Sequence, residues 1–138
     1  MIGIEVYLKL LLATILGGIV GIEREFAHKP AGLRTHMLVA LASCMFMVLS
    51  TQFTQSYADS SRIAAGVVSG IGFIGAGTII AGGRKRVVIG ITTAASIWVT
   101  AAIGMAVGFG LYPEAIFTTI LATLILWSRK ALPIEKEK

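Results

Sequence analysis

Charged residues are scarce in this sequence. Only 14 % of its 138 residues are Asp, Glu, Lys or Arg, whereas ordinary globular domains carry about 25 %. Because a soluble domain needs a charged surface, this composition excludes a soluble fold, and 56 % hydrophobic residues with a mean hydropathy of +0.86 point to a membrane. We expect residues 1–138 to form a single compact membrane domain.

Cysteine and catalytic motifs are also missing or nearly so. Cys44 stands alone in an apolar run, which excludes an intramolecular disulfide. The sequence holds no nucleophile elbow, HExxH, CxxC or P-loop pattern. Residues 70–75 fit GxGxxG, but the dinucleotide motif needs a preceding strand and an acidic residue about 20 positions on, and neither is present. We therefore predict no enzyme and no cofactor.

Long apolar runs are what the sequence does contain. The run Ile63 to Ala81 has nineteen uncharged residues and five glycines, and as a helix it would reach about 28 Å, close to the thickness of a bilayer core. So many glycines weaken a helix in water but allow close packing in lipid. We predict that this segment is the central helix of a membrane bundle, approached from more than one side.

Four further apolar runs predict an all-α integral membrane protein with five transmembrane helices. Their approximate bounds are 4–22, 33–53, 62–81, 87–109 and 113–128. We assign helix packing to Gly17, Gly21, Gly66, Gly70, Gly77, Gly104 and Gly108, which include three GxxxG pairs. Because three pairs exceed what one small bundle needs, we expect a homodimer or higher oligomer in contact through the first or third helix.

Lys and Arg mark the expected orientation. Cations fall in the first and third loops and in the C-terminal tail, while the second and fourth loops together hold only Arg62. Five spans place the three basic regions on one side. By the positive-inside rule the C-terminus is cytoplasmic and the N-terminus outside. This pattern also explains the net charge of +5 without nucleic acid, and Arg84 to Arg86 fit a topology determinant or a contact with anionic lipids.

Two clusters of ionisable residues lie at the expected membrane boundaries. On the inner side, Glu23, Arg24 and Glu25 end the first run and face Arg34 and His36 across a short loop. This cluster fits either a site for a cation, a proton or a partner, or a salt-bridged interface that anchors two helix ends. Glu23 is the best functional candidate because it lies deepest.

On the outer side, Asp59 and Arg62 stand three residues apart at the start of the third helix. They fit either an N-cap with a paired cation or a functional site. The row Thr92, Ser96 and Thr100 is typical of hydrogen bonds between helices rather than of a conduction path.

Four segments together resemble the MgtC/SapB family of bacterial inner-membrane proteins. They are GIERE (21–25), PAGLRTHMLVAL (30–41), SRIAAGVVSGIGFIGAG (61–77) and GITTAASIWVTAAIGMAVG (90–108). The resemblance implies functional roles for the matched polar residues, which are Glu23, Arg24, Glu25, Arg34, Thr35, His36, Asp59 and Arg62. Two departures are visible: the family usually has glutamine where Gly66 stands, and the ACT-type C-terminal domain of MgtC is absent from this chain, which resembles the membrane core.

The same resemblance implies a function. It indicates a regulatory role in adaptation to magnesium limitation and in survival inside phagocytes, exerted through a membrane partner such as the F-type ATP synthase. The alternative is a small oligomeric channel or transporter for magnesium, a monovalent cation or a proton. Magnesium prefers carboxylate ligands, and here Glu23 and Glu25 are separated from Asp59 by hydroxyl groups and glycines alone. We therefore favour a regulator embedded among membrane lipids.

Overall fold

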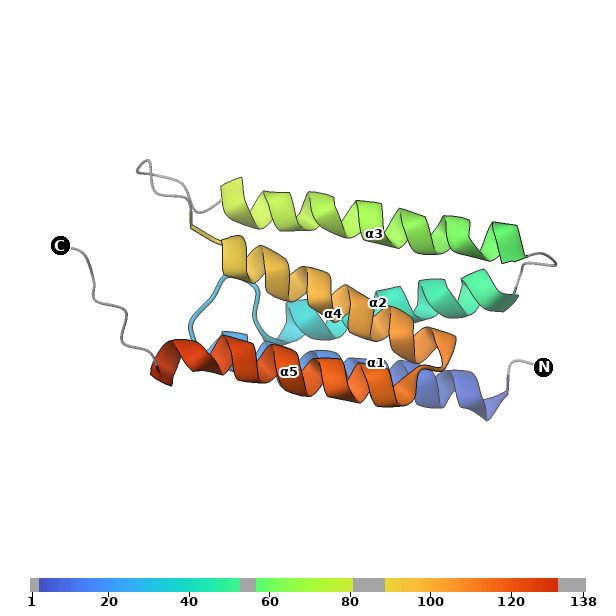
Figure 1. The fold of residues 1–138 in the computed structure, drawn as a ribbon, viewed down its shortest axis with the longest axis horizontal. Coiled ribbons are helices and arrows are strands. Elements are labelled where there is room, and N and C mark those ends of the chain that lie inside the picture. The colour runs from blue at the N-terminus through green and yellow to red at the C-terminus, as the bar shows by residue number, and fades with distance from the viewer. Residues whose placement is uncertain (1–2, 53–56, 81–88, 132–138) are drawn as a thin grey trace.

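The computed structural model describes residues 3–52, 57–80 and 89–131, which form five helices and no strand. The helices are α1 (Ile4–Phe26), α2 (Leu33–Gln52), α3 (Tyr57–Ile80), α4 (Ile91–Phe109) and α5 (Tyr112–Ala131), and they run alternately up and down one bundle (Figure 1). Helices α1 to α4 are long and apolar enough to cross a membrane, while the apolar part of α5 is shorter. The predicted all-α membrane fold is confirmed.

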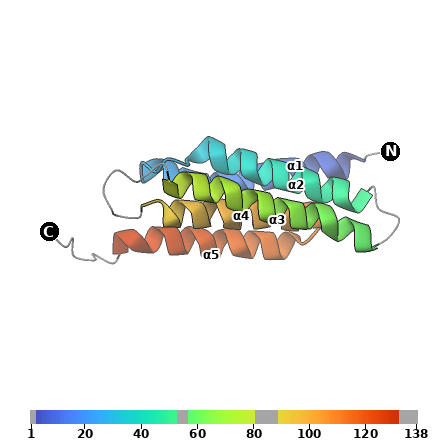
Figure 2. The ribbon, with the colours of Figure 1, turned by 90° about the horizontal axis from the view of Figure 1, so that it is seen from above.

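Helices α1, α2 and α4 form the centre of the bundle, because each packs against the other two. Helix α5 covers α1 and α4, and its Ala122 and Leu126 join a buried apolar cluster with Val20 of α1, Val48 of α2 and Val107 of α4. Helix α3 packs against α2 and α4 on another flank (Figures 1 and 2). Three helices therefore form the core, with α3 and α5 added at its sides.

The glycine-rich helix α3 is third of five along the chain, but the expectation that it lies at the centre of the bundle is wrong. Only 11 % of its apolar window is buried, against 50 % for α4. Its contacts run along one stripe that includes Val67, Ile71 and Gly75, and Phe73 on the other side is 85 % exposed. Most of the apolar surface of α3 is thus left uncovered by its own chain, and the helix lies at the edge of the bundle.

Two helix ends differ from the expected bounds for reasons that the backbone shows. Helix α1 continues to Phe26, so Glu23 to Glu25 form part of its last turn rather than following the helix. It ends where His28 adopts a φ of +52°, with bonds from His28 N–H to Glu25 O and from Lys29 N–H to Arg24 O. These bonds form a Schellman motif, which terminates a helix.

Helix α4 begins at Ile91 rather than near Val87. Gly90 has a φ of +96°, a left-handed conformation that cannot continue a right-handed helix, and it is the N-cap residue. A side chain at Gly90 would also lie 2.7 Å from Thr78 O of α3. Helix α3 itself begins at Tyr57, five residues before the expected position.

The helix ends next to all three basic segments lie at the same end of the bundle. Phe26 ends α1, Leu33 begins α2, Ile80 ends α3, Ile91 begins α4 and Ala131 ends α5, and Figure 1 shows these positions on the left. This arrangement is the one that the five-helix topology requires. Which membrane face this end occupies stays a prediction of the positive-inside rule.

Candidate functional site

Buried polar side chains gather where α1, α2 and α4 meet, towards the end of the bundle that holds the first loop. The group consists of Glu23 and Arg24 on α1, His36 on α2, and Thr93 and Ser96 on α4, and we call it the polar junction. Arg24 is 2 % exposed and His36 is fully buried. Intramembrane ionisable groups are costly and mark candidate functional sites.

Glycines bring the three backbones close enough to form this junction. A methyl group added to Gly17 would lie 2.7 Å from His36 O, and one added to Gly21 would lie 2.8 Å from Leu33 Cα. From the opposite side, a methyl group on Gly104 would overlap the Ala40 carbonyl oxygen. Gly108 is the other member of the GxxxG pair on α4, and a methyl group added to it would approach the Cys44 carbonyl oxygen too closely as well. Both GxxxG pairs therefore pack against α2 of the same chain.

Glu23 and Arg24 form an ion pair, although they are adjacent in sequence. Nε and Nη2 of Arg24 both approach Oε2 of Glu23. The side chain of Glu23 is 10 % exposed and that of Arg24 only 2 %, so the cation, and not the carboxylate, is the deeper of the two. The pair enters the membrane boundary without net charge, which lowers the cost of burying it.

His36 joins α2 to α4. Its Nδ1 lies 2.8 Å from Gly32 O, and its Nε2 lies 3.0 Å from Oγ of Ser96. Ser96 Oγ–H also points at Thr93 O at 2.8 Å, and Thr100 donates to Ser96 O at 2.8 Å. Each polar group in this series is thus hydrogen-bonded either to another helix or to the backbone of its own segment.

Glu25 has a structural role that the spacing alone did not reveal. Its Oε2 accepts a hydrogen bond from the backbone N–H of Leu33 at 2.9 Å, which satisfies a free donor at the start of α2. Gly32 leaves the space that this carboxylate occupies. Of the other residues expected nearby, Arg34 is exposed and Thr35 is half-buried.

The second predicted cluster lies at the other end of the bundle. Asp59 is within the first turn of α3, and Arg62 on the next turn is exposed. The side chain of Asp59 lies outside the described residues, as does the predicted pairing between the two. The structure therefore does not bring Asp59 and Arg62 to the polar junction, which is formed by the opposite ends of α1, α2 and α4.

The glycines of α3 differ from those of α1 and α4. Among the described residues, no atom lies within 4 Å of a methyl group placed on Gly66, Gly70 or Gly77. Their assigned role in helix packing is therefore not seen among the described residues, and it stays a prediction for contacts with another chain. The Gly17–Gly21 pair is already covered by α2, so it is not available for the expected contact between copies through α1. Helix α3 is the remaining candidate for that contact.

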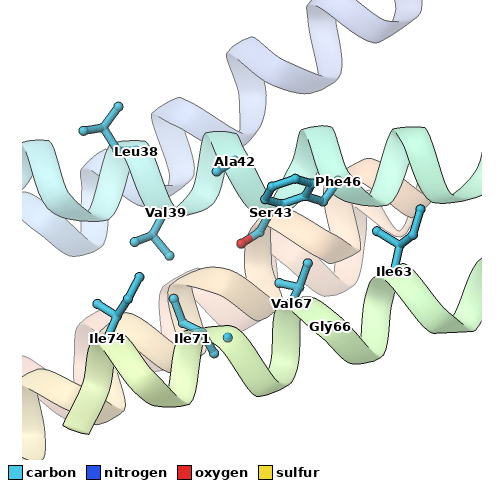
Figure 3. A pocket seen from close by; sticks show the side chains of 11 residues that line it. Leu38, Val39, Ala42, Ser43, Phe46, Ile63, Gly66, Val67, Ile71 and Ile74 are labelled. Atoms are coloured by element: carbon cyan, nitrogen blue, oxygen red, sulfur yellow. The ribbon is translucent and has the colours of Figure 1, made fainter. Parts of the chain in front are cut away.

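A groove of about 630 Å³ separates part of α3 from α2. Phe46, Leu38 and Val39 of α2 and Val67, Ile71 and Ile74 of α3 are among its lining residues, and Ser43 contributes the polar atom seen in Figure 3. Gly66 and Gly70 lie on its α3 side. The groove is apolar along its length, so it fits hydrocarbon side chains or lipid tails rather than a hydrated ion.

In the part of the chain that the structure describes, no group of three or more His, Cys, Asp or Glu residues is placed to hold a metal ion. The described carboxylates nearest to each other, Glu23 and Glu25, are committed to Arg24 and to Leu33 N–H. The polar junction can hold charge and move protons between hydrogen-bonded atoms.

Sequence reasoning missed the link between His36 and Ser96. The two residues are 60 positions apart, so no local spacing connects them. The expected row on α4 was also wrong in one member: Thr92 is exposed, and Thr93 takes the buried position beside Ser96. A helical-wheel comparison with Thr100 would have found Thr93, because residues three, four and seven apart share one face.

Comparison with known proteins gives a consistent result. The model of the MgtC family matches residues 10–133. Relatives include YhiD of Escherichia coli K12, named "Putative magnesium transporter YhiD" (45 % identity over 129 residues, 88 % of this chain and 59 % of YhiD), and SapB of Bacillus subtilis (42 % over 130 residues, 88 % and 54 %). MgtC of Brucella abortus is 44 % identical over 108 residues, 78 % of this chain and 44 % of that protein.

The chain thus spans about half the length of the curated relatives it matches. No solved structure matches it. The aligned region contains every residue of the polar junction and all of α3.

Proposed function

The chain belongs to the MgtC family, and from this membership we propose that it is a regulatory protein of the bacterial inner membrane that serves adaptation to magnesium limitation. It acts by contact with another membrane protein and not by catalysis or by carrying magnesium through its own bundle. The observation that carries the proposal is the contrast between its polar groups, which are bonded within the chain, and the outer face of α3, which is open.

The polar groups argue for a structural core rather than a transport path. Hydroxyl groups of Thr14, Thr78, Thr119 and Thr123 donate to carbonyl oxygens of their own helices. The ion pair of Glu23 and Arg24 leaves no free carboxylate at the junction for a cation. A magnesium path would need oxygen ligands at several depths, and the described residues supply carboxylates only near the bundle ends.

The outer face of α3 supports a role in protein contact. Gly66, Gly70 and Gly77 lie on one side of the helix next to the exposed Phe73, and Gly66 and Gly70 also line the groove towards α2. In lipid, small residues favour helix association because two backbones can approach closely. We propose that copies of the chain assemble into a homodimer or higher oligomer through this face, or that it receives a helix of a partner such as the F-type ATP synthase. The partner rests on the family resemblance alone, as does the role in survival inside host cells.

Two measurements test the proposal. Proteoliposomes that contain only this chain are expected to show no flux of magnesium, monovalent cations or protons above protein-free vesicles. Growth in low magnesium is expected to depend on the chain and to be lost when Gly66 and Gly70 are both replaced by leucine, while amount and folding are kept. Flux through the wild-type chain, or full growth with the double variant, would overturn the proposal.

Ion transport is the second candidate function, and the name given to YhiD favours it. Because that relative is considerably longer than this chain, its name does not establish the activity of this chain. The flux experiment decides between the two candidates directly. The control for the growth experiment is Ala65→Leu, which also adds bulk on α3 but at an exposed position away from the glycine face.

A further inference from the structure

The hydrogen-bond partners of the His36 imidazole fit both a neutral and a protonated ring. Nδ1 lies 2.8 Å from Gly32 O, and a carbonyl oxygen can only accept, so Nδ1 carries a proton. Nε2 lies 3.0 Å from Ser96 Oγ, whose O–H is directed to Thr93 O at 2.8 Å. A serine hydroxyl has one proton. It cannot serve Thr93 O and Nε2 at the same time.

Two arrangements satisfy this geometry. When the Ser96 proton points to Nε2, the ring is neutral with its own proton on Nδ1. When the Ser96 proton points to Thr93 O, Ser96 Oγ becomes an acceptor and Nε2 must donate, so the ring is an imidazolium. The two states differ by one proton on Nε2 and one rotation of the hydroxyl group. Both nitrogen atoms keep a partner in either state.

We propose that His36 is a buried proton-binding site and that the Ser96 hydroxyl group rotates to match its charge. The proton comes from water and binds to the lone pair of Nε2. The Ser96 O–H turns from Nε2 to Thr93 O, and no covalent bond of the chain is broken. Burial of the ring opposes a positive charge on it, and the preformed acceptor offsets part of that cost because a charge-assisted hydrogen bond replaces a neutral one.

The charged groups around His36 are balanced. From α1, Arg24 repels and Glu23 attracts a positive charge on the ring, and both are close enough to act on it. They form an ion pair with each other, so together they add no net charge. Helix α4 contains no ionisable residue between Ile91 and Phe109. The proton on His36 would therefore be the one uncompensated charge where the three helices meet.

The groups on α2 itself are farther from the ring. Arg34 is exposed to the surroundings, Cys44 lies two turns along the helix, and Glu25 of α1 is bonded to Leu33 N–H at the start of α2. The polar partners of the imidazole are instead Gly32 O and Ser96 Oγ.

Proton binding at this position would affect the contacts among three helices. The backbone of α1 meets that of α2 at Gly17 and Gly21, so neither helix can move away without opening the contact around His36. On the other side the hydrogen bond to Ser96 is the link between α2 and α4. A change in proton concentration at this end of the bundle would thus change the strength of the contact between α2 and α4.

The wild-type chain already allows a direct test, because it has only two histidines. His28 is exposed and serves as an internal reference. Side-chain ¹⁵N NMR of the full chain in lipid nanodiscs, from pH 4 to 9, should show His36 with its proton on Nδ1 at high pH and with both nitrogens protonated at low pH. A neutral ring protonated on Nε2, or a His36 signal that does not change over this range, would overturn the proposal.

Variants separate a proton site from ordinary packing. Ser96→Ala removes the acceptor of the imidazolium, so the proton affinity of His36 should fall at least about tenfold. Ser96→Cys keeps the volume with a weaker acceptor and should shift it in the same direction, which covers the case in which the alanine variant does not fold. Thr100→Ala removes a buried hydroxyl group one turn away and should leave the His36 titration unchanged. Equal shifts for Ser96→Cys and Thr100→Ala would contradict the assignment.

Discussion

Gly104 and Gly70 both lie in apolar helices, yet they face opposite surroundings. A methyl group on Gly104 would overlap the carbonyl oxygen of Ala40 on α2, whereas one on Gly70 would meet nothing within 4 Å among the described residues. The same contrast separates the whole junction of α1, α2 and α4 from the outer face of α3. One region has its glycines and polar groups committed within the chain, and the other leaves its glycines available for a neighbour.

The largest expected effect comes from breaking the ion pair of the polar junction. Glu23→Gln removes the charge that balances Arg24, which is 2 % exposed, and should lower the free energy of unfolding by about 3 kcal/mol. Unfolding in detergent by denaturant measures this. The control is Glu5→Gln, which breaks the pair with Lys9 at a carboxylate that is 71 % exposed, and it should change stability by less than about 0.5 kcal/mol. Similar losses in both variants would contradict the account.

Overpacking the glycine contacts should have the next largest effect. Gly104→Ala forces α4 away from α2 and should cost about 2 kcal/mol. Gly70→Ala places the same methyl group in open space on α3, and it should change stability by no more than about 0.5 kcal/mol. Thermal unfolding of the two variants side by side gives the comparison. If Gly70→Ala were the more destabilised, the placement of α3 at the edge would be wrong.

A smaller effect is expected where the junction meets the first loop. Glu25→Ala removes the acceptor for Leu33 N–H at the start of α2 and should cost about 1 kcal/mol, as for other lost helix caps. Glu25→Gln keeps a side-chain oxygen at the same reach and should recover most of that loss. Hydrogen exchange of the Leu33 amide reports on this bond directly. An amide equally protected in all three chains would rule out the cap.

The apolar runs predicted five helices with most ends within a few residues, because burial in lipid demands length and apolarity that a sequence displays directly. The ends that differ depend on backbone conformation at His28 and Gly90, which composition does not reveal. Gly17 and Gly104 were correctly expected to pack. The pattern could not tell whether a glycine faces its own chain or another, so Gly66 and Gly70 were assigned the same role.

The candidate site was predictable only in part. Glu23, Arg24 and His36 were expected near one another because a short loop joins their helices. The pairing of the two adjacent residues and the bond from His36 to Ser96 depend on how α4 is oriented in the bundle, which a single sequence does not encode in any local spacing. Asp59 and Arg62 were correctly kept apart from this cluster, since they lie at the start of α3, at the opposite end of the bundle.

The most direct test of the contrast between the two regions is photo-crosslinking in native membranes. Benzoylphenylalanine is placed at Phe73 on α3 or at Phe117 on α5, which are both exposed phenylalanines, at 85 % and 62 %. We predict a protein adduct at position 73 and none at position 117, with a mass of twice the chain for a second copy and another mass for a different partner. Adducts with lipid alone at position 73, or equal protein adducts at both positions, would contradict the claim that α3 carries the contact face of this protein.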